Sequence, residues 1–203
     1  MSQPETDTAR EFFARTSALF QRAAEDRGLA QSIEAIAQAI ASAFRSGNKI
    51  LLAGNGGSAA DAQHIAAEFL SRFVLNRAPL PAIALTTDTS VLTAIGNDFG
   101  FEQVFARQVR GLGRKGDVFI AISTSGRSPN VLAAIAAARE MGVTVVGFGG
   151  AGGDMHKQCD IYLAVPSSET ALIQQMHITV AHILCDLIEQ RLFTPDGALR
   201  TEP

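Results

Sequence analysis

Short and almost wholly apolar runs recur along the chain from residue 49 onward, and a stretch with helical periodicity separates most of them from the next. The five runs are Lys49–Ala53, Ala82–Leu85, Val118–Ser123, Thr144–Phe148 and Ile161–Val165. A run that is apolar at successive positions is typical of a strand covered on both faces, as in a parallel sheet. The pattern predicts an α/β fold in which a five-stranded parallel sheet is flanked by helices in a doubly wound arrangement.

The predicted helices follow the 3.6-residue spacing of apolar side chains. After residue 49 they are Ala59–Leu75, Ser90–Ile95, Phe101–Gly111, Asn130–Met141 and Thr170–Phe193. Before it, apolar residues recur three and four apart from Thr8 to Arg45, and Gly28 is expected to break this stretch into two helices. The chain is therefore divided into N-terminal helices at 1–47 and a ligand-binding region at 48–195, treated together as one domain. The N-terminal helices are expected to cover either this domain or a neighbouring subunit.

The composition limits the partners that the protein can have. Apolar residues make up 47% of the 203 residues and charged residues 18%, which indicates a globular protein with a sizeable core. The net charge of −3 provides no basic surface for nucleic acid, and the apolar runs are too short to span a membrane. The N-terminal residues lack the features of a signal peptide, and the 2 cysteines make no disulfide framework, so we expect a cytoplasmic protein.

A glycine-rich loop, made of Asn55, Gly56, Gly57 and Ser58, joins the first predicted strand to a helix. Glycine lets the backbone approach an anion closely, and the first turn of the helix offers unpaired N–H groups and the positive end of its dipole. These properties suit a phosphate group. A turn that only connects strand and helix has the same composition, so this loop alone leaves both interpretations open.

The second loop is rich in hydroxyl groups and follows the third predicted strand. Its residues are Ser123, Thr124, Ser125, Gly126, Arg127 and Ser128. Hydroxyl groups and backbone N–H groups together suit a phosphomonoester. One hydroxyl is enough to cap the helix that follows, so four of them favour a phosphate site over a simple helix cap.

The position of these loops narrows the class of ligand. Ligands of open parallel sheets bind at the carboxyl ends of the strands, which is where both loops lie. Neither loop has the Gly-Lys-Ser/Thr of a nucleotide-binding P-loop, and neither has the dinucleotide fingerprint with its downstream acid. A sugar phosphate is therefore favoured over a nucleotide.

Polar side chains recur at helical spacing on two of the predicted helices. His64 and Glu68 lie four residues apart, with Asp61 three residues before His64, among almost wholly apolar neighbours, which predicts a buried pair. Gln174 and His182 lie about two turns apart on the last helix. If the two helices converge, these side chains form either a zinc site or a metal-free acid–base site, and the sequence does not choose between them.

Each of these polar residues also has a purely structural interpretation. His64 and Glu68 match a solvated ion pair at i and i+4 on a helix surface. His177 and His182 each match an ordinary, partly buried histidine of a core helix. Only their position in the fold separates these interpretations.

Four segments, separated along nearly the whole chain, share their order and sequence with one known family. They are Ala53–His64, Gly96–Gly100, Ile122–Gly126 and Ile173–His182. Together they resemble the sugar isomerase (SIS) domain family and, within it, the bacterial phosphoheptose isomerases. The resemblance implies a single SIS domain with a flavodoxin-like sheet and two N-terminal helices.

The resemblance also implies a reaction and an assembly. The reaction is the conversion of D-sedoheptulose 7-phosphate to D-glycero-D-manno-heptose 7-phosphate through a cis-enediol(ate), which supplies heptose for lipopolysaccharide core biosynthesis. The assembly is a homotetramer with active sites at its subunit interfaces, and neither nucleic acid nor membrane is a partner. The resemblance implies that the N-terminal helices at 1–47 pack in this oligomer.

Site residues are carried over from the family by motif. The substrate-binding positions fall on Asn55, Gly56, Gly57, Ser58, Asn97, Asp98, Ser123, Thr124, Ser125, Ser128 and Gln174. The family's catalytic pair falls on Glu68 and His182, and Asp61 is expected to orient or relay protons. Its metal set, for one Zn²⁺ per subunit, falls on His64, Glu68, Gln174 and His182.

Two features of this metal set remain open. A glutamate bound to zinc is a poorer base, so both roles stay attached to Glu68. Some relatives also carry an acid three residues before the position of Gln174, where this chain has Ala171. The departure affects the detail of the site and not its class.

A non-catalytic relative of the same fold is the main alternative. The DnaA initiator-associating protein, a tetrameric binding protein of replication initiation, is similar at Leu80–Leu85 and Cys185–Ile188. It lacks the glutamate and the last histidine of the isomerases, whereas this chain keeps both, as Glu68 and His182. A sugar-phosphate-sensing regulator would carry an added DNA-binding domain, for which this chain has no room. The enzyme is therefore favoured.

Overall fold

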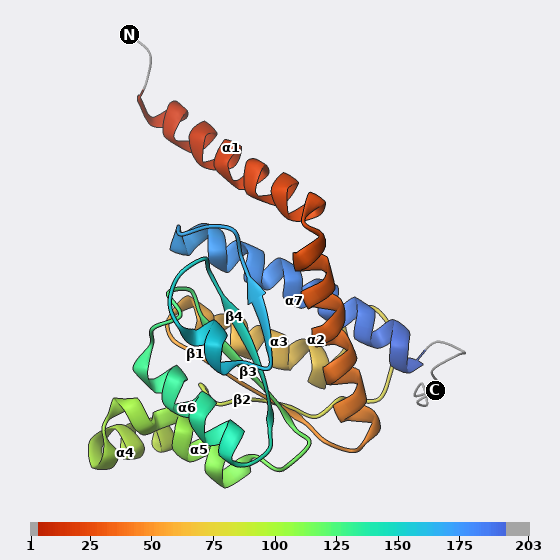
Figure 1. Ribbon diagram of the computed structural model, residues 1–203, viewed down its shortest axis with the longest axis vertical. Helices are drawn as coiled ribbons and strands as arrows, with labels where there is room; N and C mark the ends of the chain where they lie inside the picture. The colour runs from red at the N-terminus through yellow and green to blue at the C-terminus, as the bar shows by residue number, and fades with distance from the viewer. Residues whose placement is uncertain (1–3, 194–203) are drawn as a thin grey trace.

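One parallel sheet lies at the centre of the protein (Figure 1). The computed structural model describes residues 4–193, and the strand order is β2-β1-β3-β4-β5 with every neighbouring pair parallel. The strands are β1 (Ile50–Gly54), β2 (Ala82–Ala84), β3 (Val118–Ser123), β4 (Thr144–Gly149) and β5 (Ile161–Ala164). This is the order of flavodoxin-like doubly wound sheets, so the predicted fold class is confirmed and all five predicted strands are present.

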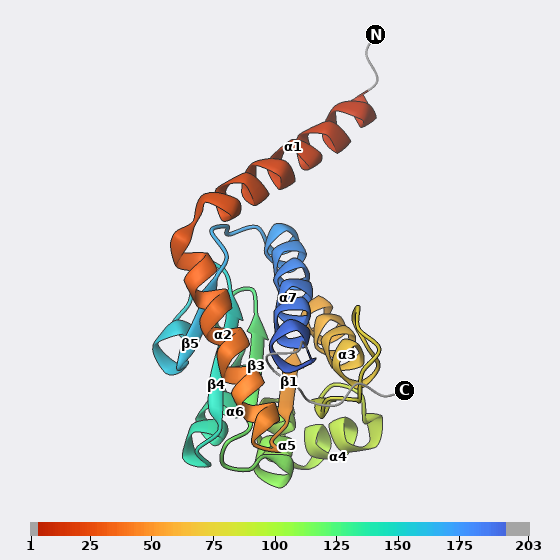
Figure 2. The same ribbon diagram turned by 90° about the vertical axis from the view of Figure 1, so that its right-hand side faces the viewer.

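Helices connect the strands and cover both faces of the sheet. They are α1 (Pro4–Glu25), α2 (Arg27–Arg45), α3 (Gly57–Leu70), α4 (Thr89–Phe99), α5 (Val104–Leu112), α6 (Pro129–Glu140) and α7 (Thr170–Phe193), with 3-10 turns η1 (Phe101–Gln103) and η2 (Met155–Gln158). Helices α2, α3 and α7 pack on one face, and α5 and α6 pack on the other (Figure 2). The predicted division at residue 48 stays a prediction, and residues 1–3 of its first part and 194 and 195 of its second part lie outside the described residues.

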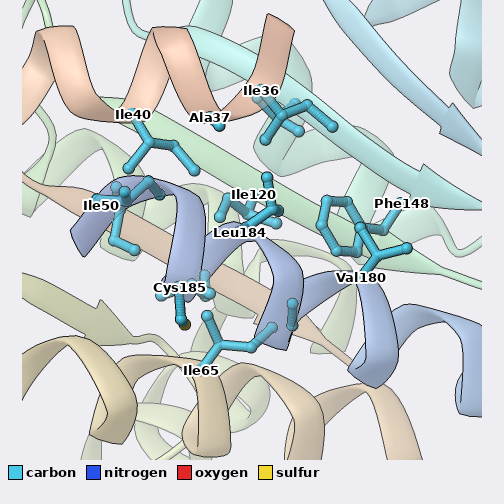
Figure 3. Packing of buried hydrophobic residues seen from close by; sticks show 14 of the residues in the cluster. Ile36, Ala37, Ile40, Ile50, Ile65, Ile120, Phe148, Val180, Leu184 and Cys185 are labelled. Carbon is cyan, nitrogen blue, oxygen red and sulfur yellow. The ribbon is translucent and has the colours of Figure 1, made fainter. Parts of the chain in front are cut away.

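Helix α7 is the central element of the first face. It runs between α2 and α3, and its Val180 and Leu184 belong to one buried cluster with Ile36, Ile120 and Phe148 (Figure 3). By length and composition alone α7 could cross a membrane, yet 50% of its apolar window is buried inside the protein. Its apolar character therefore has an explanation in the packing of the core.

The break between the first two helices lies at Asp26 and not at Gly28, so the predicted position is wrong. The Asp26 carboxylate accepts hydrogen bonds from the backbone N–H groups of Gly28 (2.8 Å) and Leu29 (3.0 Å), which caps α2. Gly28 lies in the first turn of α2. Aspartate is among the best N-cap residues, and this local preference sets the boundary.

Helix α3 ends at Leu70, whereas the apolar spacing predicts a helix as far as Leu75. The backbone N–H groups of Phe73, Val74 and Leu75 donate to the buried carboxylate of a distant residue on α7 (2.9, 2.9 and 2.8 Å). A segment cannot direct these N–H groups outward and also use them within a helix. A tertiary contact therefore overrides the local pattern.

Helix α4 is longer than predicted, and the next predicted helix is divided. α4 continues past Ile95 to Phe99, and Gly100, with φ +85°, ends it. The segment Phe101–Gly111 then begins as η1 and continues as α5. Positive φ favours glycine, so the chain changes direction at this position.

The cap at Asp26 predicts the effect of a substitution. Asp26→Ala should lower the free energy of unfolding by about 1 kcal/mol, because two N–H groups lose their acceptor. Gly28→Ala should have a smaller effect, because alanine favours the helix, which offsets the close approach of its Cβ to Asp26 Oδ1 (3.2 Å). Urea unfolding followed by circular dichroism measures both, and a larger loss for Gly28→Ala would contradict the assignment.

Candidate functional site

A pocket lies where the strand order of the sheet reverses, between β1 and β3. The loops that follow these strands both contribute to it, and its volume is about 300 Å³. Its lining residues are Asn55, Gly56, Gly57, Ser58, Ile122, Ser123, Thr124, Ser128, Thr170 and Gln174. Ligands of doubly wound sheets bind at such a switch point, so the structure brings both predicted phosphate loops to the expected place.

The glycine-rich loop presents the N-terminus of α3 to this pocket. Gly56 adopts φ +55°, a conformation that favours glycine, and α3 begins at the next residue. No side chain of the loop caps the helix. The Ser58 and Ala59 N–H groups donate to the carbonyl oxygens of Asn55 and Gly56 (3.0 Å each), so the Gly57 N–H and the helix dipole are what α3 offers to an anion.

Two asparagines join the loops. Asn55 Nδ2 donates to Asn130 Oδ1 (2.9 Å), and Asn130 Nδ2 donates to Asn55 Oδ1 (2.9 Å). Asn130 is almost fully buried in the first turn of α6. The sequence did not single out Asn130 as a site residue, because its partner lies 75 positions away and its burial is visible only in the structure.

The hydroxyl-rich loop is ordered by its own side chains. Ser123 Oγ and Ser128 Oγ lie 3.0 Å apart, and Ser123 is buried. Ser125 is exposed, lies outside the pocket lining, and accepts a hydrogen bond from the Arg127 N–H (3.3 Å). The pocket also includes Thr170, which the sequence did not single out.

Gln174 connects the pocket to α7. Its side chain lies against Gly57, where a Cβ would overlap the Gln174 amide. Glycine at position 57 is therefore required for this contact between α3 and α7. The described contacts place Gln174 at the pocket, and its predicted role as a metal ligand stays a prediction.

Three further predicted site residues meet between α3 and α7. His64 Nε2 lies 2.9 Å from His182 Nε2 and 3.3 Å from Glu68 Oε1, and the three ligand atoms all lie within 4.8 Å of one another. Two imidazole nitrogens at such a distance need a proton or a cation between them. Neighbouring ligands in a tetrahedral zinc site with bonds of 2.0–2.1 Å lie about 3.3 Å apart, so this donor set fits such an ion.

The prediction that His64 and Glu68 form a buried pair is wrong for the single chain. Their side chains are 46% and 23% exposed, because α7 covers only one side of this part of α3. The ring of Phe73 stacks on the ring of His182, with centroids 5.5 Å apart and planes inclined by 22°. The cluster is therefore open to solvent on one side and supported by an aromatic ring on another.

Asp61 lies one turn before His64 on α3. Burial raises the pKa of the Asp61 carboxyl, and the neighbouring His64 acts in the opposite direction. Its Oδ2 is buried and has no hydrogen-bond partner among the described residues. A carboxyl in this state is suited to exchange a proton, which agrees with the role predicted for Asp61 but does not test it.

His177 lies apart from the cluster and is fully buried against the sheet. Burial lowers the pKa of its imidazole to about 4, although a hydrogen bond to Gly149 opposes the effect. Its Nε2 lies 3.4 Å from the Gly149 carbonyl oxygen, and its ring packs on Phe148. His177 is thus a neutral residue of the core, in agreement with the purely structural interpretation of this histidine.

Asn97 and Asp98 do not join the pocket in the single chain. They are exposed near the C-terminal end of α4, where Asn97 Nδ2 donates to Asp98 Oδ1 (2.8 Å). α4 packs on η1 and α5, at the end of the molecule opposite α1 (Figure 1). A larger cavity of about 550 Å³ lies between α4 and α5, but its lining is mainly apolar and includes no residue of the phosphate loops.

Comparison with known proteins identifies related sequences and folds. The family model described as "SIS domain" matches residues 11–150. A phosphoheptose isomerase from Bradyrhizobium sp. strain BTAi1 is 55% identical over 193 residues, which cover 95% of this chain and 98% of that protein. One from Roseiflexus sp. strain RS-1 is 61% identical over 165 residues, which cover 81% and 84%.

Among solved structures, the phosphoheptose isomerase of Neisseria gonorrhoeae is similar to this chain with a TM-score of 0.86. The two chains are 43% identical, and the match covers 91% of this chain and 98% of the other. Sequence and fold therefore agree over nearly the full length of the chain.

The paired asparagines predict an effect on phosphate binding. Asn130→Ala should raise the dissociation constant for inorganic phosphate about 10-fold, because the Asn55 side chain loses both partners and the glycine-rich loop loosens. Isothermal titration measures it, with Asn76→Ala, an exposed asparagine outside the pocket, as the control. Equal affinities for the two variants would contradict the role of the pair.

Proposed function

The chain belongs to the SIS domain family, and on that premise we propose that it is a phosphoheptose isomerase. It converts D-sedoheptulose 7-phosphate to D-glycero-D-manno-heptose 7-phosphate, an aldose–ketose isomerisation. Relatives at 55% and 61% identity carry this name, and their matches cover most of both chains. The product supplies heptose for lipopolysaccharide core biosynthesis.

The single observation that carries the proposal is the meeting of Glu68 and His182 beside a phosphate pocket. They come from α3 and α7, and a third residue, His64, lies within 3.3 Å of Glu68. A carboxylate and an imidazole side by side can move protons between neighbouring atoms of a substrate. A non-catalytic binding protein of the same fold has no need of this pair, so it is the less favoured function.

The pocket accounts for the binding of an open-chain sugar phosphate. The phosphate accepts hydrogen bonds from the N-terminus of α3 and from the hydroxyls of Ser123, Thr124 and Ser128, which line the pocket. Gln174 and His182 are eight positions apart, which is about 12 Å along α7. An open-chain heptose phosphate can cover this distance, so its C1 and C2 atoms reach the His64, Glu68 and His182 cluster.

The proton steps are assigned to the two residues that meet there. One of Glu68 and His182 removes a proton from C1 of the ketose, which leaves a cis-enediol(ate), and then delivers a proton to C2 to give the aldose. The other residue moves a proton between O1 and O2. Asp61, with its raised pKa, orients or relays these protons.

A metal ion suits the same cluster. We assign one Zn²⁺ per subunit to His64, Glu68 and His182, because the spacing of the three donor atoms fits this ion. The Gln174 amide, predicted as the fourth ligand, lies against Gly57 at the phosphate pocket in this structure. When bound, zinc would polarise the substrate carbonyl. Glu68, whose side chain is 23% exposed, keeps both of its predicted roles, as a zinc ligand and as a base.

We further propose that the protein is a cytoplasmic homotetramer with active sites at its subunit interfaces. α1 projects from the rest of the molecule (Figure 2) and exposes 74% of Phe13. α4 has no buried residue and exposes 52% of Phe99. Covering these faces by other copies would bury apolar surface, close the open side of the cluster, and let Asn97 and Asp98 approach a neighbouring site.

Turnover of sedoheptulose 7-phosphate tests the reaction. Glu68→Gln and His182→Asn should each lower kcat about 1000-fold, because each removes a group that moves protons in the transition state. The matched controls are Glu140→Gln and His156→Asn, exposed residues away from the cluster, which should keep wild-type kcat. Wild-type protein without turnover would refute the enzyme, and active Glu68→Gln and His182→Asn variants would refute the site.

Metal content tests the cofactor separately. The purified protein should hold one zinc per subunit by mass spectrometry, and its removal by a chelator should lower kcat at least about 100-fold, with recovery when zinc is restored. His64→Ala should reduce zinc occupancy because it removes one ligand. Full activity in protein verified to be metal-free would contradict the assignment.

A further inference from the structure

A buried ion pair lies behind the cluster of His64, Glu68 and His182. Arg77 and Glu189 are 3% and 1% exposed, and Arg77 Nε donates to Glu189 Oε1 (2.8 Å). Neither residue belongs to the proposed substrate or metal machinery. A buried ion pair is tolerated only where hydrogen bonds satisfy the remaining polar atoms of both groups, so the other contacts of this pair identify what it holds in place.

Glu189 holds the segment that follows α3. Its carboxylate accepts from the backbone N–H groups of Phe73, Val74 and Leu75, in addition to Arg77. Burial by itself would raise the pKa of Glu189, but these hydrogen bonds together lower it, so the residue is a carboxylate. The segment is thereby fixed to α7 at Glu189. Glu189 follows His182 by seven residues and therefore lies on nearly the same face of that helix.

Arg77 holds the end of α3 itself. Its Nη2 donates to the Glu68 carbonyl oxygen (2.9 Å), and its Nη1 donates to the carbonyl oxygens of Phe69 (2.8 Å) and Ala78 (3.1 Å). The guanidinium therefore binds the backbone of the residue whose side chain faces His64. Its planar fork fixes direction as well as distance.

The same pair also reaches His182 through Phe73. The Phe73 N–H is bound to Glu189, and the Phe73 ring stacks on the His182 ring. One buried carboxylate thus determines where the aromatic support of His182 lies. Both sides of the cluster, Glu68 on α3 and His182 on α7, are connected to one ion pair.

We propose that Arg77 and Glu189 are positioning residues of the active site, which set the orientation of Glu68 directly and of His182 through Phe73. This inference rests on the proposed function, since it concerns the same cluster. Residues that orient metal ligands from behind change metal affinity 10–100-fold when they are altered. The pair therefore affects zinc binding and kcat more than it affects binding of the distant phosphate group.

The test compares variants that disturb the clamp with one that disturbs a similar pair elsewhere. Glu189→Gln places an amide N–H against backbone N–H groups, and Phe73→Leu removes the ring from His182 while leaving the pair intact. The control is Asp117→Asn. Asp117 is 1% exposed, and its carboxylate accepts a hydrogen bond from Lys49 Nζ (2.6 Å). Lys49 directly precedes β1 and Asp117 directly precedes β3, so this pair lies at the end of the strands opposite the pocket.

The readouts are the zinc dissociation constant by chelator competition, the phosphate dissociation constant by titration, kcat and KM, and the urea midpoint. Glu189→Gln should weaken zinc binding 10–100-fold and Phe73→Leu about 10-fold, with lower kcat and with phosphate affinity and KM within about twofold of wild type. Asp117→Asn should lower the urea midpoint and leave zinc affinity unchanged.

Several results would overturn the proposal. Zinc affinities of Glu189→Gln and Phe73→Leu within twofold of wild type would do so, as would an equal loss in Asp117→Asn. If Glu189→Gln does not fold, Arg77→Lys takes its place, because lysine keeps the charge but loses the planar fork that binds the Glu68 and Phe69 carbonyl oxygens. A wild type that binds zinc and turns over normally while the variants match it refutes the positioning role only, whereas a wild type that does neither refutes the proposed function and this inference with it.

Discussion

β1 and β3 pair in parallel from Ile50 and Val118 to Gly54 and Ile122, so both strands end at one edge of the sheet. This pairing lies where the strand order reverses, and the helices that follow the two strands leave on opposite faces. A space therefore remains between the two loops that regular packing does not fill. The reciprocal hydrogen bonds of Asn55 and Asn130 hold the loops at the width of that space.

Helix α7 connects this edge of the sheet to the rest of the site. Its Gln174 contacts the glycine-rich loop, its His182 meets His64, and its Glu189 binds the segment after α3. A core helix with these polar residues is stable only because each has a partner or is neutral, as His177 is with its lowered pKa. Function and packing thus depend on the same helix.

Much of this organisation could be predicted, because its signals are local in the sequence. Two predictions match the structure residue for residue. They are the strand Val118–Ser123, predicted from a continuous apolar run, and the helix Thr170–Phe193, predicted from the helical spacing of its apolar residues. The meeting of the two predicted phosphate loops was predictable because each follows a strand of the parallel sheet. The predictions that were wrong concerned features that depend on contacts between positions far apart in the sequence. The end of α3 at Leu70 is set by Glu189, more than 100 positions away, and the exposure of His64 depends on how much of α3 the last helix covers.

The central claim is that one site holds the phosphate at the β1 and β3 loops and carries out chemistry between α3 and α7. A crystal structure of the Glu68→Gln variant with zinc and sedoheptulose 7-phosphate tests it most directly. The account predicts phosphate density beside Asn55 and Ser123, with C1 and C2 and an anomalous zinc peak at His64 and His182. Phosphate bound elsewhere, or a sugar whose C1 and C2 point away from His182, would contradict it.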